Sequence, residues 1–373
     1  MAPRATSTFS QVNARQFLAI AIAITVGFAI GPSLFFSVCV AALLWLTASS
    51  PAERVLAVAL PAAFRLALAF GAFHFEPPTQ IVDLATDGTS PVSLFLQQDL
   101  WWARYLVEYP SIMAMDLWGM RFVEAFALYS AALLPVTSVA LLACIRVWRR
   151  LSESEALMVG AAFGVLVAVV ASQMNGRLIP AHLGMTLILL AQARVLAQSA
   201  LRAREALLML SGLVLGHMTS GTGLVAYADL IAGGLLPIAV GASRAQVGGV
   251  LWILSAFFGP LLLRDLLKNV DFYGGGAGAI VTMLDHGAGI VLRQYPWLAL
   301  LAFGVLALVA VTAWTQRSRF DRVPRTLWPA IVAMPVTSIG GLYGYSTLSM
   351  GLPPLLILLM AGVISRSMRQ PAA

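Results

Sequence analysis

Apolar runs of spanning length recur along the whole chain, and they limit the folds that it can adopt. A helix needs about 20 apolar residues to cross a bilayer, and no stretch longer than about 45 residues lacks such a run. Of the 373 residues, 60% are hydrophobic and 10% are charged, which leaves too few polar side chains to cover a globular surface. The sequence therefore predicts an all-α polytopic transmembrane helix bundle, with residues 1–373 forming a single integral-membrane domain.

Runs of about 15 to 25 apolar residues predict about twelve spans. Only Gly31, Pro32 and Ser33 separate the first two runs, and the count becomes eleven if this break is a kink rather than a turn. The predicted spans are 16–31, 33–48, 55–75, 121–145, 155–173, 179–197, 206–220, 222–241, 247–263, 288–313, 326–342 and 346–364.

The positions of the arginines orient these spans. With a cytoplasmic N-terminus, sixteen of the 23 basic residues fall on the inner side. Cytoplasmic loops carry this bias, so we expect both termini in the cytoplasm. The bias also explains the basic pI of about 9.9 without any nucleic-acid partner. The remaining cations fall within the membrane or at its outer side: Arg65, Arg104, Arg121, Arg177, Arg264, Lys268 and Arg293.

Arg65 lies at the centre of the predicted span 55–75, between apolar flanks. A guanidinium keeps its proton, so such a residue must face a partner, a water-filled cavity or an anionic ligand. Two interpretations remain open. Asp229, in the eighth span, is a candidate ion-pair partner, whereas a group formed with Arg177 and Arg293 would suit a phosphate or pyrophosphate.

The first large outer loop, residues 76–120, combines acidic and aromatic residues. Its second half is typical of an amphipathic helix in the membrane interface, and a sugar-stacking surface is the alternative role for its aromatic residues. The aromatic candidates are Trp101, Trp102, Tyr105 and Tyr109. Glu76, Asp83 and Asp87 are candidate general bases by position.

A second outer loop is predicted at 264–287, and it is rich in glycine. Its glycine cluster, 274–278, follows no strand, so we expect a hinge rather than a nucleotide-binding loop. Cys39 and Cys144 lie at different depths, which predicts neither a disulfide nor a metal site. Two pairs of glycines spaced four residues apart predict close helix packing: Gly160 with Gly164, and Gly212 with Gly216.

Two short motifs resemble bacterial exopolysaccharide polymerases of the EpsG and Wzy type. One is the segment 172–177, which places Arg177 before an apolar helix, and the other is 216–220, which places His217 and two hydroxyl residues at the end of the next. Arg65 before an acidic loop is also similar to the N-terminal pattern of those proteins. The resemblance covers roughly 65–220, a little under half of the chain.

The resemblance implies a metal-independent inner-membrane enzyme that joins undecaprenyl-diphosphate-linked oligosaccharides at the periplasmic face. In such an enzyme arginines would stabilise the leaving diphosphate, and a base would take the proton of the acceptor hydroxyl. We assign the diphosphate to Arg65, Arg177 and Arg293, and the base to His217 or to an acid of the first loop. The expected partners are the lipid-linked oligosaccharide, the membrane and other polysaccharide-assembly proteins, and no cofactor is expected.

Two other classes remain open. A glycosyltransferase that uses a polyprenyl-phosphate sugar would also carry acids in its first large outer loop, but would hold a divalent metal between carboxylates. A secondary transporter of a small anionic solute would instead use Arg65 and Asp229 as substrate or proton groups near the midplane.

Overall fold

The computed structural model describes seven stretches of the chain. The chain forms two compact units. Unit 1 contains 1–85, 108–142 and 151–176, and unit 2 contains 86–107, 143–150 and 177–373. The described residues are 14–97, 101–173, 176–239, 244–285, 293, 323–341 and 349–367.

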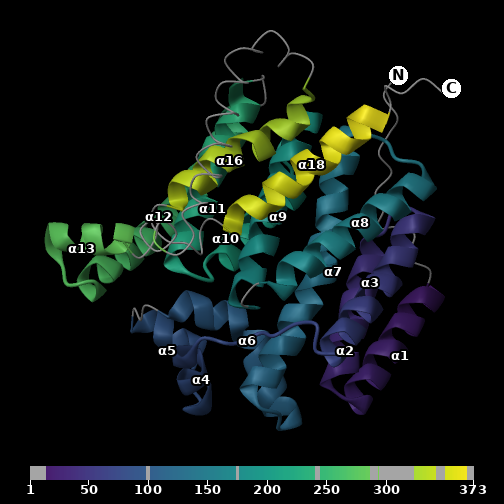
Figure 1. The fold of residues 1–373 in the computed structure, drawn as a ribbon, viewed down its shortest axis with the longest axis horizontal. Coiled ribbons are helices and arrows are strands. Elements are labelled where there is room, and N and C mark those ends of the chain that lie inside the picture. The colour runs from purple at the N-terminus through teal and green to yellow at the C-terminus, as the bar shows by residue number, and fades with distance from the viewer. Residues whose placement is uncertain are drawn as a thin grey trace. The chain divides into compact units, whose positions relative to one another are not determined.

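Unit 1 is built on three consecutive N-terminal helices that lie side by side (Figure 1). Gly31 separates the first two with a φ of 144°, and Pro32 at the first position of the second helix has no N–H to leave unpaired. The backbones then approach closely, because a Cβ on Gly27 would lie 3.3 Å from Cα of Phe35. The break is therefore a turn. The helices are α1 (Ala14–Ile30), α2 (Pro32–Thr47) and α3 (Pro51–Ala69).

Helix α8 (Glu153–Ser172) packs on α3 through two glycines. A Cβ on Gly160 would lie 2.3 Å from Cδ1 of Leu56, and one on Gly164 would lie 2.7 Å from Cδ2 of Leu60. The predicted role of this glycine pair in close packing is confirmed. Unit 1 also contains most of α4 (Thr79–Thr86), the C-terminal part of α6 (Trp102–Trp118) and the N-terminal part of α7 (Phe122–Trp148). The remaining residues of these three helices belong to unit 2.

Unit 2 is organised around α9 (Ile179–Gln198), which is buried along most of its length. It contacts α10 (Ala203–Gly216), α11 (Ser220–Ala239), α16 (Trp328–Gly340) and α18 (Leu352–Ser367). Helix α11 in turn packs against α12 (Arg244–Phe272). The remaining described elements of this unit are α5 (Pro91–Leu96), η2 (Gly176–Leu178, from its second residue on), α13 (Gly276–Leu284), η5 (Arg325–Leu327) and η6 (Ser349–Gly351).

The backbones of α9 and α10 are in direct contact. A Cβ on Gly212 would lie 2.6 Å from the carbonyl oxygen of Gly184, and one on Gly184 would lie 2.5 Å from that of Gly212. A Cβ on Gly216 would lie 2.8 Å from Cβ of Ala226 in α11. The second glycine pair therefore also marks close packing, as predicted.

The described residues are helical and contain no strand, and four of their helices are long and apolar enough to cross a membrane. Four shorter apolar helices accompany them: 16–30, 32–47, 221–235 and 349–365. The twelve predicted spans are not confirmed as a set, and the predicted span 288–313 lies outside the described residues apart from Arg293. The four long segments are Phe122–Trp148, Glu153–Ser172, Gly176–Gln198 and Gln246–Phe272.

Two predicted boundaries are wrong. The span 55–75 ends at Ala69, and Gly71, with a φ of 73°, begins an extended segment. The segment 76–120 contains α4, α5 and α6, and α6 is the helix predicted in its second half, although Trp102 and Tyr105 are buried rather than exposed as anchors. The loop 264–287 is mostly helix, because α12 continues to Phe272 and α13 follows after a turn at three glycines with positive φ.

We expect Gly212→Ala to lower the free energy of unfolding by about 1 to 3 kcal/mol, because the new methyl group overlaps a carbonyl oxygen of α9. Chemical unfolding in detergent, followed by circular dichroism, measures the change. Gly248→Ala in α12 is the matched control, since nothing lies within 4 Å of its Cβ position. That substitution should leave stability unchanged or raise it by up to about 1 kcal/mol. Equal effects of the two substitutions would contradict the packing role of Gly212.

Candidate functional site

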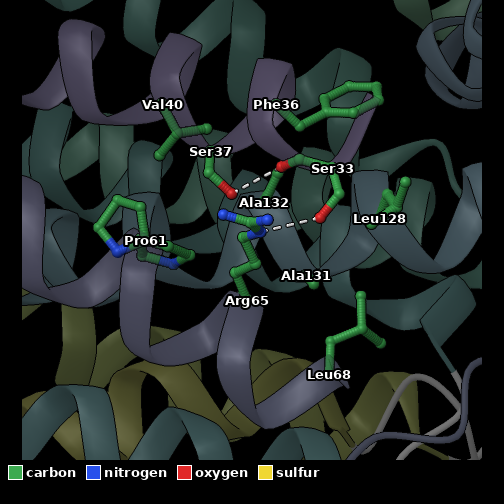
Figure 2. A pocket seen from close by; sticks show the side chains of 11 residues that line it. Ser33, Phe36, Ser37, Val40, Pro61, Arg65, Leu68, Leu128, Ala131 and Ala132 are labelled. Carbon is green, nitrogen blue, oxygen red and sulfur yellow. Dashed lines mark hydrogen bonds between the residues drawn. The ribbon is translucent and has the colours of Figure 1, made fainter. Parts of the chain in front are cut away.

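Arg65 lies in a groove of unit 1 formed by α2, α3 and α7 (Figure 2). The groove is partly open, and the empty space along it, open solvent included, is about 290 Å³. Apart from Arg65 and two serines of α2, its lining is apolar. Ser33 follows the turn between α1 and α2, so the same break that separates these helices places a hydroxyl beside Arg65. The residues that line the groove are Ser33, Phe36, Ser37, Val40, Pro61, Arg65, Leu68, Leu128, Ala131, Ala132 and Pro135.

Arg65 makes one side-chain hydrogen bond among the described residues: its Nε donates to Oγ of Ser33 at 3.0 Å. Ser37, one turn further along α2, donates to the carbonyl oxygen of Ser33 at 2.9 Å. Figure 2 shows the guanidinium directed toward these two serines. No carboxylate of the described residues forms an ion pair with Arg65. Its positive charge therefore remains available to an anion that enters the groove.

His217 anchors a second polar cluster, which lies within unit 2. It ends α10, and its Nδ1 lies 2.8 Å from the carbonyl oxygen of Leu213. The ring is 5% exposed and packs against Phe258 of α12 at a centroid distance of 5.4 Å. Gly223 makes room for it, because a Cβ there would lie 3.2 Å from Cδ2 of the ring. Nε2 has no hydrogen-bond partner in the described part of the chain.

The segment that follows His217 is held by reciprocal hydrogen bonds at the start of α11. The main-chain N–H of Thr222 donates to Oγ1 of Thr219, and that of Thr219 donates to Oγ1 of Thr222, both at 3.0 Å. Oγ1 of Thr222 also donates to the carbonyl oxygen of Gly216 at 2.6 Å. These bonds cap α11 as a capping box does and close the turn that carries His217.

Two charged residues of α12 lie beside this turn. Arg264 donates from Nη2 and Nε to Oδ1 of Asp265, at 3.1 Å and 3.3 Å. Asp265 is 3% exposed and interacts electrostatically with both His217 and Lys268. A positive charge that forms on the imidazole would therefore be stabilised by a buried carboxylate.

Arg104 connects the aromatic residues of α6 to the same turn. Its Nε donates to the carbonyl oxygen of Met218, and its guanidinium lies 4.7 Å from the ring centroid of Trp101. Trp102 is buried against Phe95, with ring centroids 5.2 Å apart. A cation over an indole face is a common arrangement that also stiffens both side chains. Unit 2 thus joins a histidine, a carboxylate, guanidinium groups and tryptophans in one cluster.

The other predicted site residues are distributed over both units. Arg177 is half-buried in η2, at the start of the α9 segment of unit 2. Arg293 is exposed and donates to both carboxylate oxygens of Asp285, at 2.6 Å and 2.9 Å. Its charge is therefore already neutralised, which weakens its assignment to a diphosphate.

The three acidic candidates, Glu76, Asp83 and Asp87, are all exposed. Glu76, in unit 1, lies at 3.2 Å from Nε2 of His74, because the chain alternates here and buries Phe73 and Phe75 on the opposite side. Asp87 follows α4 in a turn of unit 2. Neither Glu76 nor Asp87 forms a hydrogen bond or ion pair with His217 in the described part of the chain. Among the predicted catalytic and sugar-binding residues, the structure brings Trp101 to the turn of His217, through Arg104.

Sequence reasoning missed Arg104, Asp265, Gly223 and Ser33. Arg104 is the one basic residue of an acidic loop, and Asp265 follows an arginine directly, so charge pattern alone could have drawn attention to both. Ser33 and Gly223 carry no such signal, because their importance depends on which neighbour packs against them. No group of three or more His, Cys, Asp or Glu side chains that could hold a metal ion is found in the described ranges.

No protein-family model matches this chain, and no curated protein or solved structure matches it either.

We expect Thr222→Val to lower the free energy of unfolding by about 1 to 3 kcal/mol, because it leaves a buried N–H and a buried carbonyl unpaired. Thermal unfolding in detergent micelles measures this change. Thr25→Val is the matched control, since Thr25 is exposed and bonds only to the carbonyl oxygen of Ala21 in its own helix. An equally small effect at both positions would contradict the role of Thr222 in closing the turn.

Proposed function

We propose that this chain is an integral-membrane enzyme that transfers glycosyl groups from a polyprenyl-diphosphate-linked oligosaccharide, in the synthesis of an envelope polysaccharide. The observation that carries the proposal is the groove of Arg65, in which an unneutralised guanidinium lies among apolar side chains. An anion that carries an apolar chain complements such a groove better than a fully hydrated solute does, because the chain replaces water along the apolar walls.

The proposed reaction needs a base, and the cluster of His217 is suited to supply it. The acceptor hydroxyl would attack the anomeric carbon while Nε2 of His217 takes the hydroxyl proton, and the bond between that carbon and the diphosphate oxygen would break. The diphosphate would leave with the bonding electron pair, and its charge would be stabilised by guanidinium groups, of which Arg177 is our first candidate. Asp265 would stabilise the protonated imidazole, and Glu76 and Asp87 are alternative bases.

Trp101 and Trp102 are the proposed sugar-binding residues. The ring face of Trp101, which also contacts Arg104, would stack on the sugar, and Trp102, packed on Phe95, would support this part of α6.

We further propose that the reaction takes place at the periplasmic face of a bacterial inner membrane, with both termini in the cytoplasm. No cofactor is required by this scheme. The alternative glycosyltransferase class requires a divalent metal, so activity that is lost with a chelator and restored by added metal would favour that class.

A transporter of a small anionic solute is the second candidate, and one observation favours it. Asp229 is a fully buried carboxyl group in α11, a helix of apolar sequence. Buried ionisable groups in membrane helices commonly take part in proton or solute movement. Uptake of solute by vesicles that contain the purified protein, with no polymer formed, would favour transport over glycosyl transfer.

We expect Arg65→Ala to weaken binding of a polyprenyl diphosphate at least tenfold, because about 1.4 kcal/mol of charge-assisted binding corresponds to each factor of ten. Binding of a fluorescent short-chain polyprenyl diphosphate to protein in nanodiscs measures the loss. Arg121→Ala is the matched control, since Arg121 is exposed and already pairs with Glu124 in the same unit. Unchanged binding by Arg65→Ala would contradict the role of the groove.

In cells, Arg65→Ala and Arg177→Ala should abolish polymer formation while the protein still accumulates in the membrane.

We expect His217→Gln to lower the rate of glycosyl transfer by about 10² to 10⁴, the usual contribution of a general base, with lipid binding retained. Single-turnover transfer of a labelled oligosaccharide measures the rate. His74→Gln is the control, since His74 is exposed and bonds to Glu76. A normal rate of transfer by His217→Gln would contradict the assignment of His217 as the base and would favour one of the exposed acids instead.

A further inference from the structure

Asp229 is a buried carboxyl group with no ion-pair partner among the described residues. It is completely buried in unit 2, and neither of its carboxylate oxygens has a hydrogen-bond partner in the described part of the chain. By contrast, Asp265 and Asp285 each bond to an arginine. An ionised carboxylate in the environment of Asp229 would have neither a counter-charge nor a donor to replace the water that it has lost.

Gln192 of α9 reaches the turn of α11 that carries Asp229. Its Nε2 donates to the main-chain carbonyl oxygen of Asp229 at 3.1 Å, and its side chain is completely buried. Gly233, one turn further along α11, makes room for it, since a Cβ there would lie 2.3 Å from Nε2. The amide oxygen, Oε1, has no partner in the described ranges. Its packing therefore places a second buried acceptor on the same turn.

Charged groups of the neighbouring helices do not compensate Asp229. Helix α16 carries no titratable residue, and no described cation of the other helices forms an ion pair with Asp229. Those helices are α9, α10 and α12. The described titratable residues that they carry are His182, Arg194, Arg204, Glu205, Arg264, Asp265, Lys268 and Asp271.

Asp229 and Gly233 are one turn apart, so the carboxyl group of Asp229 and the amide of Gln192 lie against the same face of α11. The two carboxylate oxygens and Oε1 of Gln192 are buried there, and none has a donor in the described part of the chain. One added proton resolves this arrangement, because it removes the charge and turns one carboxylate oxygen into an O–H donor. We infer that Asp229 is a proton-binding site, which holds a proton at neutral pH and donates it in a hydrogen bond to Oε1 of Gln192. The amide would then bond to α11 at two points, through its N–H and through its oxygen.

This site is independent of the proposed glycosyl transfer. It provides a carboxyl group that can gain and lose a proton inside an apolar helix, which is the requirement for coupling a movement of the bundle to a proton gradient. Neither the Arg65 groove nor the His217 cluster contributes a residue to this site, so the inference about Asp229 would still hold if the proposed glycosyl transfer were disproved.

Infrared difference spectroscopy tests the inference directly. The spectrum of the wild-type protein minus that of Asp229→Asn, both at neutral pH in detergent, should contain the carbonyl stretch of a protonated carboxylic acid. This band should shift in protein that contains ¹³C-labelled aspartate. Asp285→Asn is the matched control, because Asp285 is exposed and paired with Arg293, and its difference spectrum should contain carboxylate bands. Carboxylate bands for Asp229 as well would overturn the inference, and their dependence on sodium would identify a metal cation in place of the proton.

Two further variants complete the test. If Asp229→Asn does not fold, Asp229→Glu serves instead, and the acid band should then respond to labelled glutamate rather than labelled aspartate. Gln192→Leu should move the Asp229 band to higher wavenumber, because the O–H loses its acceptor. A band that stays in place would show that Gln192 is not the acceptor.

Discussion

Unit 2 depends on the close approach of α9 and α10, which is possible only because two glycines face each other. Gly184 and Gly212 leave no space for a side chain, and each backbone lies against a carbonyl oxygen of the other helix. In an apolar bundle, the hydrophobic effect does little to hold one helix against another, so such short contacts contribute much of the association. The end of α10, and with it His217, is positioned by this contact.

Most charged side chains discussed above are neutralised by a neighbour in the same unit. Whether a side chain has such a partner distinguishes residues with a structural role from candidates for ligand binding. Arg121, Arg264 and Arg293 each pair with a carboxylate, and these pairs account for their charge. Arg65 is bonded to a serine hydroxyl, which orients the guanidinium but leaves its charge available. Asp229 has no compensation except a bound proton. These uncompensated groups are the ones that we assign to ligands. For Asp229, only a ligand or a proton repays its burial, whereas the exposed guanidinium of Arg65 is accessible to an anion.

Helical character, apolar patterning and glycine-mediated packing were all predictable from the sequence. Gly31 with Pro32 marks a helix boundary because of backbone stereochemistry, and the glycine pairs of α8 and α10 mark close contacts because only glycine permits them. Boundaries defined by hydrophobicity alone failed where apolar residues are buried outside a helix. Phe73 and Phe75 extended the predicted span beyond Ala69, although they pack in an extended segment. The same criterion ended the predicted span 247–263 just before Arg264, although α12 continues to Phe272 because a helix tolerates charges at its end.

The sequence by itself determined that this chain is a helical membrane protein and that Arg65, His217 and Asp229 require special surroundings, since the free energy of burying a charge or an imidazole is a property of the residue type. Only the tertiary structure decided what those surroundings are. Ser33 beside Arg65, Asp265 beside His217 and Gln192 beside Asp229 all come from other helices. Helix packing places such pairs through the shapes of many apolar side chains at once, and no local spacing along the chain records the result.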